Sequence, residues 1–65
     1  MEHKFKVGDI LKRRDRAYKG YPSSILITQT YRMRGIDFYG FLNLDGGKIE
    51  RLASHIVEVD YKKAA

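Results

Sequence analysis

The side chains of this chain that could carry out chemistry are two histidines, three serines and a long series of arginines, lysines and tyrosines. A metal site needs three or four converging ligands, but no HxH or HxxxH pair and no cysteine accompanies His3 or His55. Ser54 precedes His55, yet neighbouring residues in a turn usually point apart, and no GxSxG elbow is present. We therefore expect no catalytic residue, no metal ligand and no cofactor.

The acidic residues and the glycine pair also have a structural explanation. Glu50, Glu58 and Asp60 alternate with apolar residues, which is typical of solvent-facing positions on strands. Gly46-Gly47 is not followed by a helical pattern, whereas a phosphate-binding loop joins a strand to a helix N-terminus. These features indicate strands and a turn, and we expect a protein that is not an enzyme.

The main functional signal is a series of basic residues interleaved with aromatic ones. The net charge is +5, and residues 12–34 alone hold seven basic residues against one acid, for a net of +6. The rest of the chain holds six basic and seven acidic residues, for a net of −1. Cationic side chains bind phosphates, and aromatic faces stack on bases. The predicted nucleic-acid or anion-binding residues are Arg13, Arg14, Arg16, Tyr18, Lys19, Tyr21, Tyr31, Arg32, Arg34 and Tyr39.

On this prediction, loop 12–21 and turn 31–35 lie together on one accessible face. Two other interpretations of the same pattern stay open. A charged loop can simply keep a small protein soluble, while its tyrosines pack over the ends of the fold with their hydroxyls in water. A nucleotide or another small anion needs the same chemistry in a smaller pocket.

Five short segments with strand patterns must position these side chains. Asp45-Gly46-Gly47 lies between two apolar-rich runs and predicts a hairpin, because tight hairpin turns need the positive φ that glycine tolerates. No segment shows helical periodicity over 11 or more residues. The expected strands are residues 10–13, 23–31, 38–44, 48–52 and 56–61, with a short turn at 53–55.

The alternation of apolar residues in these strands predicts which side chains are buried. A turn at Asp45-Gly46 would place Leu42 opposite Ile49, and Phe41 opposite Glu50 on the other face. The expected core consists of Ile10, Ile25, Ile27, Leu42, Ile49, Val57 and Val59.

Two stretches carry a family resemblance. Residues 5–11 (FKVGDIL) resemble the opening strand of SH3, KOW and Tudor-type barrels. Residues 52–59 (LASHIVEV) resemble the end of such a barrel, where a strand enters one turn of 3₁₀ helix and leaves as the closing strand. The resemblance implies one domain over residues 1–65: an all-β, five-stranded, mostly antiparallel SH3-like barrel with a short 3₁₀ turn before the last strand. The chain has no Trp and one Pro, so the resemblance extends to the fold and not to a proline-peptide ligand.

The resemblance also bears on function. KOW- and Tudor-like barrels often bind nucleic acid, which implies a non-enzymatic binding module for an anionic partner, nucleic acid first. Small stand-alone domains also resemble accessory proteins of bacteriophages, so two alternatives remain. One is a protein-binding inhibitor or adaptor that acts on a host protein, and the other is a homo-oligomer that sequesters a nucleotide signal.

The composition limits the compartment. No run approaches the roughly 18 apolar residues that a membrane span needs. The first residues lack the apolar core of a signal peptide, and there is no cysteine for a disulfide framework. We expect a cytoplasmic protein with no membrane partner.

Overall fold

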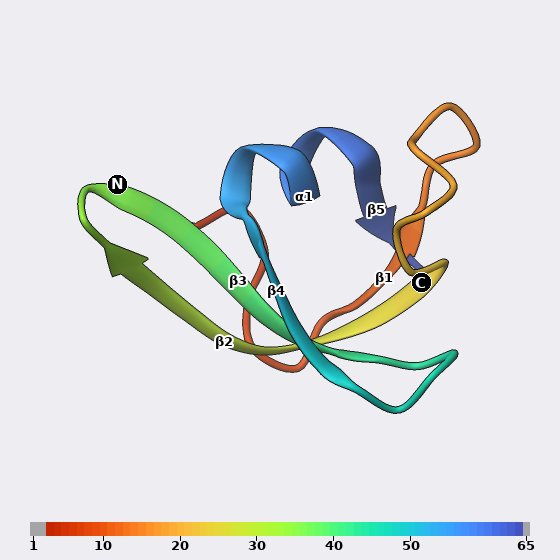
Figure 1. The fold of residues 1–65 in the computed structure, drawn as a ribbon, viewed down its shortest axis with the longest axis horizontal. Coiled ribbons are helices and arrows are strands. Elements are labelled where there is room, and N and C mark those ends of the chain that lie inside the picture. Colours follow the sequence, from red (N-terminus) through yellow and green to blue (C-terminus); the bar gives the residue numbers. More distant parts are fainter. Residues whose placement is uncertain (1–2, 65) are drawn as a thin grey trace.

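The computed structural model describes residues 3–64. Over this range the chain forms β1 (Ile10–Arg13), β2 (Ser24–Met33), β3 (Ile36–Asn43), β4 (Ile49–Ala53), α1 (Ser54–Asp60) and β5 (Tyr61–Lys63). Every strand pair is antiparallel, and the sheet order is β4-β3-β2-β1-β5, so the last strand returns to pair with the first (Figure 1). The prediction of an all-β fold with five antiparallel strands is confirmed, and the sheet is compatible with a small β-barrel-like fold.

The sheet is strongly curved, and its curvature has a local cause. The β2–β3 register shifts between Ile27 and Gln29, which leaves Thr28 as an extra residue. A bulge of this kind bends its strand and increases the local twist. As a result β2 and β3 sweep across the molecule, and α1 lies between the ends of β4 and β5, where it packs on β3, β4 and β5 (Figure 1).

The core is built mainly from aromatic and aliphatic side chains on the inner face of the sheet. Its buried members are Phe5, Leu11, Ile25, Ile27, Tyr39, Phe41, Val57 and Tyr61. Three of these eight are aromatic residues of β3 and β5, which bury more apolar area per residue than any aliphatic side chain.

The predicted core is only partly correct. Ile25, Ile27 and Val57 are buried, but Ile10, Ile49 and Val59 are 50%, 71% and 60% exposed. Leu42 is half-buried. Since three of the seven predicted core residues are exposed, the predicted buried face is wrong for part of the chain.

The error concerns the face and not the pairing. Leu42 does lie opposite Ile49, and Phe41 opposite Glu50, as predicted. However, Phe41 faces the core, so Leu42 and Ile49 lie on the outer face. Because side chains alternate with a period of two, choosing the wrong face moves every residue of a strand to the other side.

The segment before the last strand is an α-helix and not a 3₁₀ turn. The predicted strand at residues 56–61 is also wrong, because α1 runs over Ser54–Asp60 and leaves only Tyr61–Lys63 as strand. The helix buries Val57 in the core and leaves Val59 exposed. Its seven residues make about two turns, which is shorter than the window over which helical periodicity can be read.

The predicted turn between β3 and β4 is confirmed. Gly47 has a positive φ of 74°, and its N–H donates to the Asn43 carbonyl at 2.7 Å. The Asn43 side-chain oxygen accepts from the N–H groups of Asp45 and Gly46 at 2.9 and 3.2 Å. The turn is therefore held by both the backbone and the side chain of Asn43.

Candidate anion-binding site

The predicted site residues divide between the two ends of β2. Loop 14–23 precedes Ser24, whereas the Arg34-Gly35 turn follows Met33 at the other end of the strand (Figure 1). Figure 1 shows that the bent β2 carries the loop and the turn to opposite ends of the molecule's longest axis, which measures 28 Å. The prediction that the basic residues of both segments form one face is therefore wrong, because a strand intervenes between them.

At the loop end, two lysines face each other across the sheet. Lys12 of β1 lies directly opposite Lys62 of β5, and both side chains are exposed. Like charges placed directly opposite in a ladder destabilise the pairing. Within residues 3–64 the ion pairs are Arg32–Asp37 and Lys63–Asp9, so neither lysine is neutralised by a carboxylate.

The loop that follows β1 brings three further basic residues to this end. The Arg14 N–H donates to the Asp60 carbonyl at 2.8 Å, which holds the start of the loop against the end of α1. Arg16 and Lys19 are exposed in the same loop, together with the acidic Asp15. We call Lys12, Arg14, Arg16, Lys19 and Lys62 the loop-end basic cluster.

Arg13 has a structural role that its charge did not reveal. Its Nη1 donates to the carbonyls of Lys19 and Tyr21, so the guanidinium folds the loop back on β1. The Tyr61 hydroxyl donates to the Pro22 carbonyl and holds the other end of the loop. Burial raises the pKa of Tyr61 to about 12, so this hydroxyl keeps its proton near neutral pH. Hydrogen bonds from Arg13 and Tyr61 to backbone carbonyl groups of the loop therefore hold it in place.

Tyr18 is the accessible aromatic ring at the loop end. Its side chain is 70% exposed, and it meets Tyr21 edge to face at 5.1 Å between centroids. A Cβ atom on Gly20 would lie 2.3 Å from the Tyr18 ring, so the ring rests directly on that glycine. Tyr21 is half-buried and packs against the core. Tyr18 is therefore held in place while much of its ring remains open to a ligand.

At the hairpin end, Arg32 and Tyr31 are already in contact with neighbours. Arg32 donates to the Gly35 carbonyl at 3.2 Å and lies 3.8 Å from the Asp37 carboxylate. Tyr31 stacks on Phe38, with ring centroids 5.5 Å apart and planes 15° from parallel. Arg34 is exposed and has a positive φ of 52° in the two-residue turn.

The predicted stacking role of Tyr39 is wrong. Tyr39 is fully buried, so no ligand can reach its ring. Burial, followed by a hydrogen bond to Glu58, raises the pKa of Tyr39 well above its ordinary value. Its sequence neighbours are the half-buried Phe38 and the buried Gly40, and the inner face of β3 carries Tyr39 into the core.

The outer face of the sheet holds a pocket that joins the predicted Tyr31 to residues that sequence reasoning missed. Gln29, Tyr31, Gly40, Ile49, Glu50 and Arg51 line an open pocket of about 300 Å³. The Arg51 guanidinium lies 5.7 Å from the centroid of the Phe38 ring. The predicted Phe41–Glu50 pairing already implies that Arg51 lies opposite Gly40, so the register could have revealed this site.

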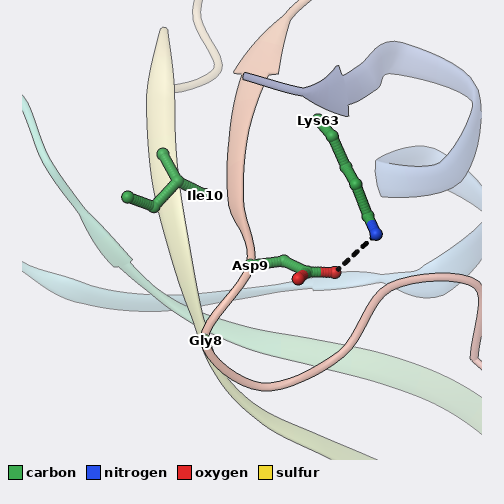
Figure 2. Close-up of a pocket in the computed structure, with 4 residues that line it drawn as sticks. All are labelled: Gly8, Asp9, Ile10 and Lys63. Carbon is green, nitrogen blue, oxygen red and sulfur yellow. Dashed lines mark ion pairs between the residues drawn. The ribbon is translucent and has the colours of Figure 1, made fainter. Parts of the chain in front are cut away.

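A second pocket lies beside the start of β1 and is lined by Gly8, Asp9, Ile10 and Lys63 (Figure 2). Its volume is about 270 Å³. The Asp9 carboxylate accepts from the Lys6 N–H at 2.9 Å and pairs with Lys63 at 3.7 Å, as Figure 2 shows for the lysine. Its charged groups already neutralise each other, so this contact is best explained as holding β5 beside the residues that precede β1.

The histidines and the helix suggest no other kind of site. In residues 3–64 no three His, Cys, Asp or Glu side chains gather where they could hold a metal ion. His3 donates from Nε2 to the Phe38 carbonyl at 3.1 Å, and its ring packs on Tyr39. Across the same residues no helix has the length and apolar character to cross a membrane. No known protein family, curated protein or solved structure matches this chain.

Proposed function

We propose that this protein is a non-enzymatic module of the SH3-like barrel type that binds an anionic partner, first of all nucleic acid, through the loop-end basic cluster. The observation that supports this most directly is the pairing of Lys12 with Lys62. Two exposed lysines held opposite each other, without a carboxylate between them, are arranged to share one phosphate group. The two lysines repel each other in the free protein, and this repulsion is relieved when an anion binds between them.

The surroundings of the lysine pair suit a polymer of phosphates better than a single ion. Arg16 and Lys19 add positive charge on a loop that Arg13 and Tyr61 hold in place, so little ordering is needed when a ligand binds. Tyr18 offers an exposed ring beside these charges. Phosphate binding combined with base stacking is the usual chemistry of single-strand binding.

The test is a fluorescence-anisotropy titration at several salt concentrations with single strands, duplexes and mononucleotides. Lys12→Gln and Lys62→Gln should each weaken binding and reduce the log–log salt slope by about one unit. Lys4→Gln is the matched control, since it removes one positive charge from a lysine that lies over the Phe5 ring, outside the cluster. If the unaltered protein binds none of these ligands at low salt, the proposal is wrong.

A second candidate, a protein-binding inhibitor or adaptor, is favoured by a different observation. Ile10, Leu26, Leu42 and Ile49 are consecutive cross-strand neighbours on the outer face. Ile10 is 50% exposed and Ile49 is 71% exposed. An apolar row of this kind suits a protein surface, and such binding should depend little on salt, in contrast to phosphate binding. Ile49→Ser, which changes no charge, should abolish it while leaving the salt slope for nucleic acid unchanged.

Native mass spectrometry separates these functions from the third possibility, an oligomer that holds a nucleotide. The protein would be purified from cells and sprayed without a denaturing step. A retained nucleotide in a complex of several subunits would support sequestration. A retained polynucleotide on one subunit would support the nucleic-acid proposal.

A further inference from the structure

We propose that the pocket around Gly40 on the outer face binds an unstacked nucleobase, so that the protein prefers single strands to duplexes. This inference deepens the proposed function, and it rests on that function for the claim that the ligand is a nucleic-acid strand. The pocket itself can be tested separately, because the recognition of a base does not require phosphate.

The register places Gly40 at the centre of a patch of nine residues from β2, β3 and β4. Gln29 and Arg51 are its direct cross-strand neighbours. On one side lies the row Tyr31, Phe38 and Ala53, and on the other side lies the row Leu26, Leu42 and Ile49. Gly40 has no side chain, whereas the eight residues around it do, so the outer face is hollowed at the centre of the patch.

A side chain at position 40 would press against the residue that lies over this glycine. A Cβ atom on Gly40 would come within 3.2 Å of the Gln29 Cβ and 3.6 Å of its Oε1. The side chain of Gln29 therefore lies across Gly40, and its amide stands at the floor of the pocket. An amide presents both donors and an acceptor, which is the combination that pairs with the edge of a base.

The walls of the pocket suit the faces of a base. Tyr31 lines it and is supported from behind by its stacking on Phe38. Arg51 lines the pocket from β4, and its guanidinium lies over the Phe38 ring. Aromatic rings and guanidinium planes are the groups on which unstacked bases are held. Ile49 closes the remaining side with an exposed apolar surface.

The charges of the pocket fit the same ligand. Arg51 forms no ion pair within residues 3–64, so its charge remains for a phosphate. Glu50 is the one acid in the lining, and its carboxylate accepts from the Asn43 side chain at 3.0 Å. Glu50 lies opposite the core residue Phe41, so its side chain leaves β4 on the other face from Arg51, and a phosphate would approach from the Arg51 side.

A duplex cannot use this pocket as a single strand can. In a duplex the bases are stacked and paired, so their faces are not available to Tyr31 and their pairing edges are not available to Gln29. Loss of the Tyr31 or Gln29 side chain should therefore change affinity for single strands and leave affinity for duplexes unaltered.

The first experiment tests the pocket without phosphate. Adenosine and uridine, which carry no charge, are titrated into ¹⁵N-labelled protein and followed by NMR. The backbone N–H of Gly40 and the side-chain amide of Gln29 should shift together and saturate. The backbone N–H resonance of Lys12, which belongs to the loop-end basic cluster, should not shift.

The second experiment uses variants and short labelled oligonucleotides in anisotropy titrations. Tyr31→Leu removes the aromatic ring, and Gln29→Leu removes the amide at similar volume. Each should weaken single-strand binding about tenfold, which is within the range for loss of one stacked base. Arg34→Gln is the control for Arg51→Gln, because both remove one charge from an exposed arginine. Circular dichroism and analytical ultracentrifugation establish that each variant is folded and report its subunit number.

The outcomes separate the two proposals. Nucleoside shifts at Gly40, together with selective loss of single-strand affinity, support the base pocket. Polymer binding that Tyr31→Leu and Gln29→Leu leave unchanged, without nucleoside shifts, overturns the pocket and leaves the proposed function standing. Nucleoside shifts without any polymer binding support the pocket and overturn the proposed function. Burial of the pocket in a stable dimer, as seen by ultracentrifugation and unshifted amides, overturns the pocket.

Discussion

The Tyr39 hydroxyl donates a hydrogen bond to the Glu58 carboxylate at 2.6 Å and accepts one from the Phe5 N–H at 2.9 Å. The same Glu58 oxygen accepts from the Lys4 N–H at 2.9 Å. This chain of contacts joins β3, α1 and the residues before β1. It ties the helix to β3 and to the residues that precede β1.

We expect Tyr39→Phe to lower the free energy of unfolding by about 1–3 kcal/mol, because it leaves the buried Phe5 N–H without an acceptor. Glu58→Gln should cost less, since the amide oxygen can accept the same two hydrogen bonds. Urea titrations of both variants measure the difference. Equal stability of Tyr39→Phe and the unaltered protein would contradict the importance of this contact.

Stability should also fall at alkaline pH because of Tyr61. Its pKa is raised by burial to about 12 in the folded state, against an ordinary value of 10.0. The unfolded chain therefore loses this proton first, so the stabilisation is complete below about pH 10 and decreases as the pH rises through about 12. Urea midpoints measured at increasing pH should show this decrease, and Tyr61→Phe should make the dependence shallower. Parallel curves for the two proteins would exclude the tyrosine as the cause.

The β3–β4 turn offers a matched pair of substitutions. Gly47 has a φ of 74°, whereas Gly46 is outside the left-handed region and a Cβ atom there would meet only ordinary contacts. Gly47→Ala should cost about 1–2 kcal/mol, because the left-handed conformation penalises a side chain. Gly46→Ala should cost clearly less. Thermal unfolding of both variants tests the assignment, which fails if the order is reversed.

The two faces of the hairpin can be distinguished in the same way. Phe41 is fully buried and lies opposite the exposed Glu50, whereas Ile49 is 71% exposed. Phe41→Ala should cost about 3–5 kcal/mol, which could unfold a domain of this size. Ile49→Ala should change stability by less than about 1 kcal/mol. A large loss for Ile49→Ala in a monomer would contradict the assigned faces.

Local features of this fold were predictable from the sequence. The Asp45-Gly46-Gly47 turn and the pairing of Leu42 with Ile49 depend on residues close in the chain, and both are confirmed. The buried face was not predictable in the same way, because β3 carries apolar residues on both sides. Tyr39 and Phe41 occupy one face and Leu42 the other, so alternation alone could not decide between them.

The candidate site depended on contacts that no local pattern contains. Lys12 and Lys62 are 50 positions apart, and only the return of β5 to β1 brings them together. Arg13 was predicted from its charge to bind a ligand, yet its guanidinium holds the loop. The basic residues of both segments were assigned to one surface because they are close in sequence, and the ten-residue β2 separates them.

The position of Lys62 on a strand of three residues has a thermodynamic consequence. A strand this short at the edge of a sheet is among the first parts of a fold to open, and repulsion between Lys12 and Lys62 favours that opening. An anion that binds both lysines binds only the closed form. Ligand and strand docking are then linked, so the ligand should slow hydrogen exchange at β5 more than elsewhere in the sheet.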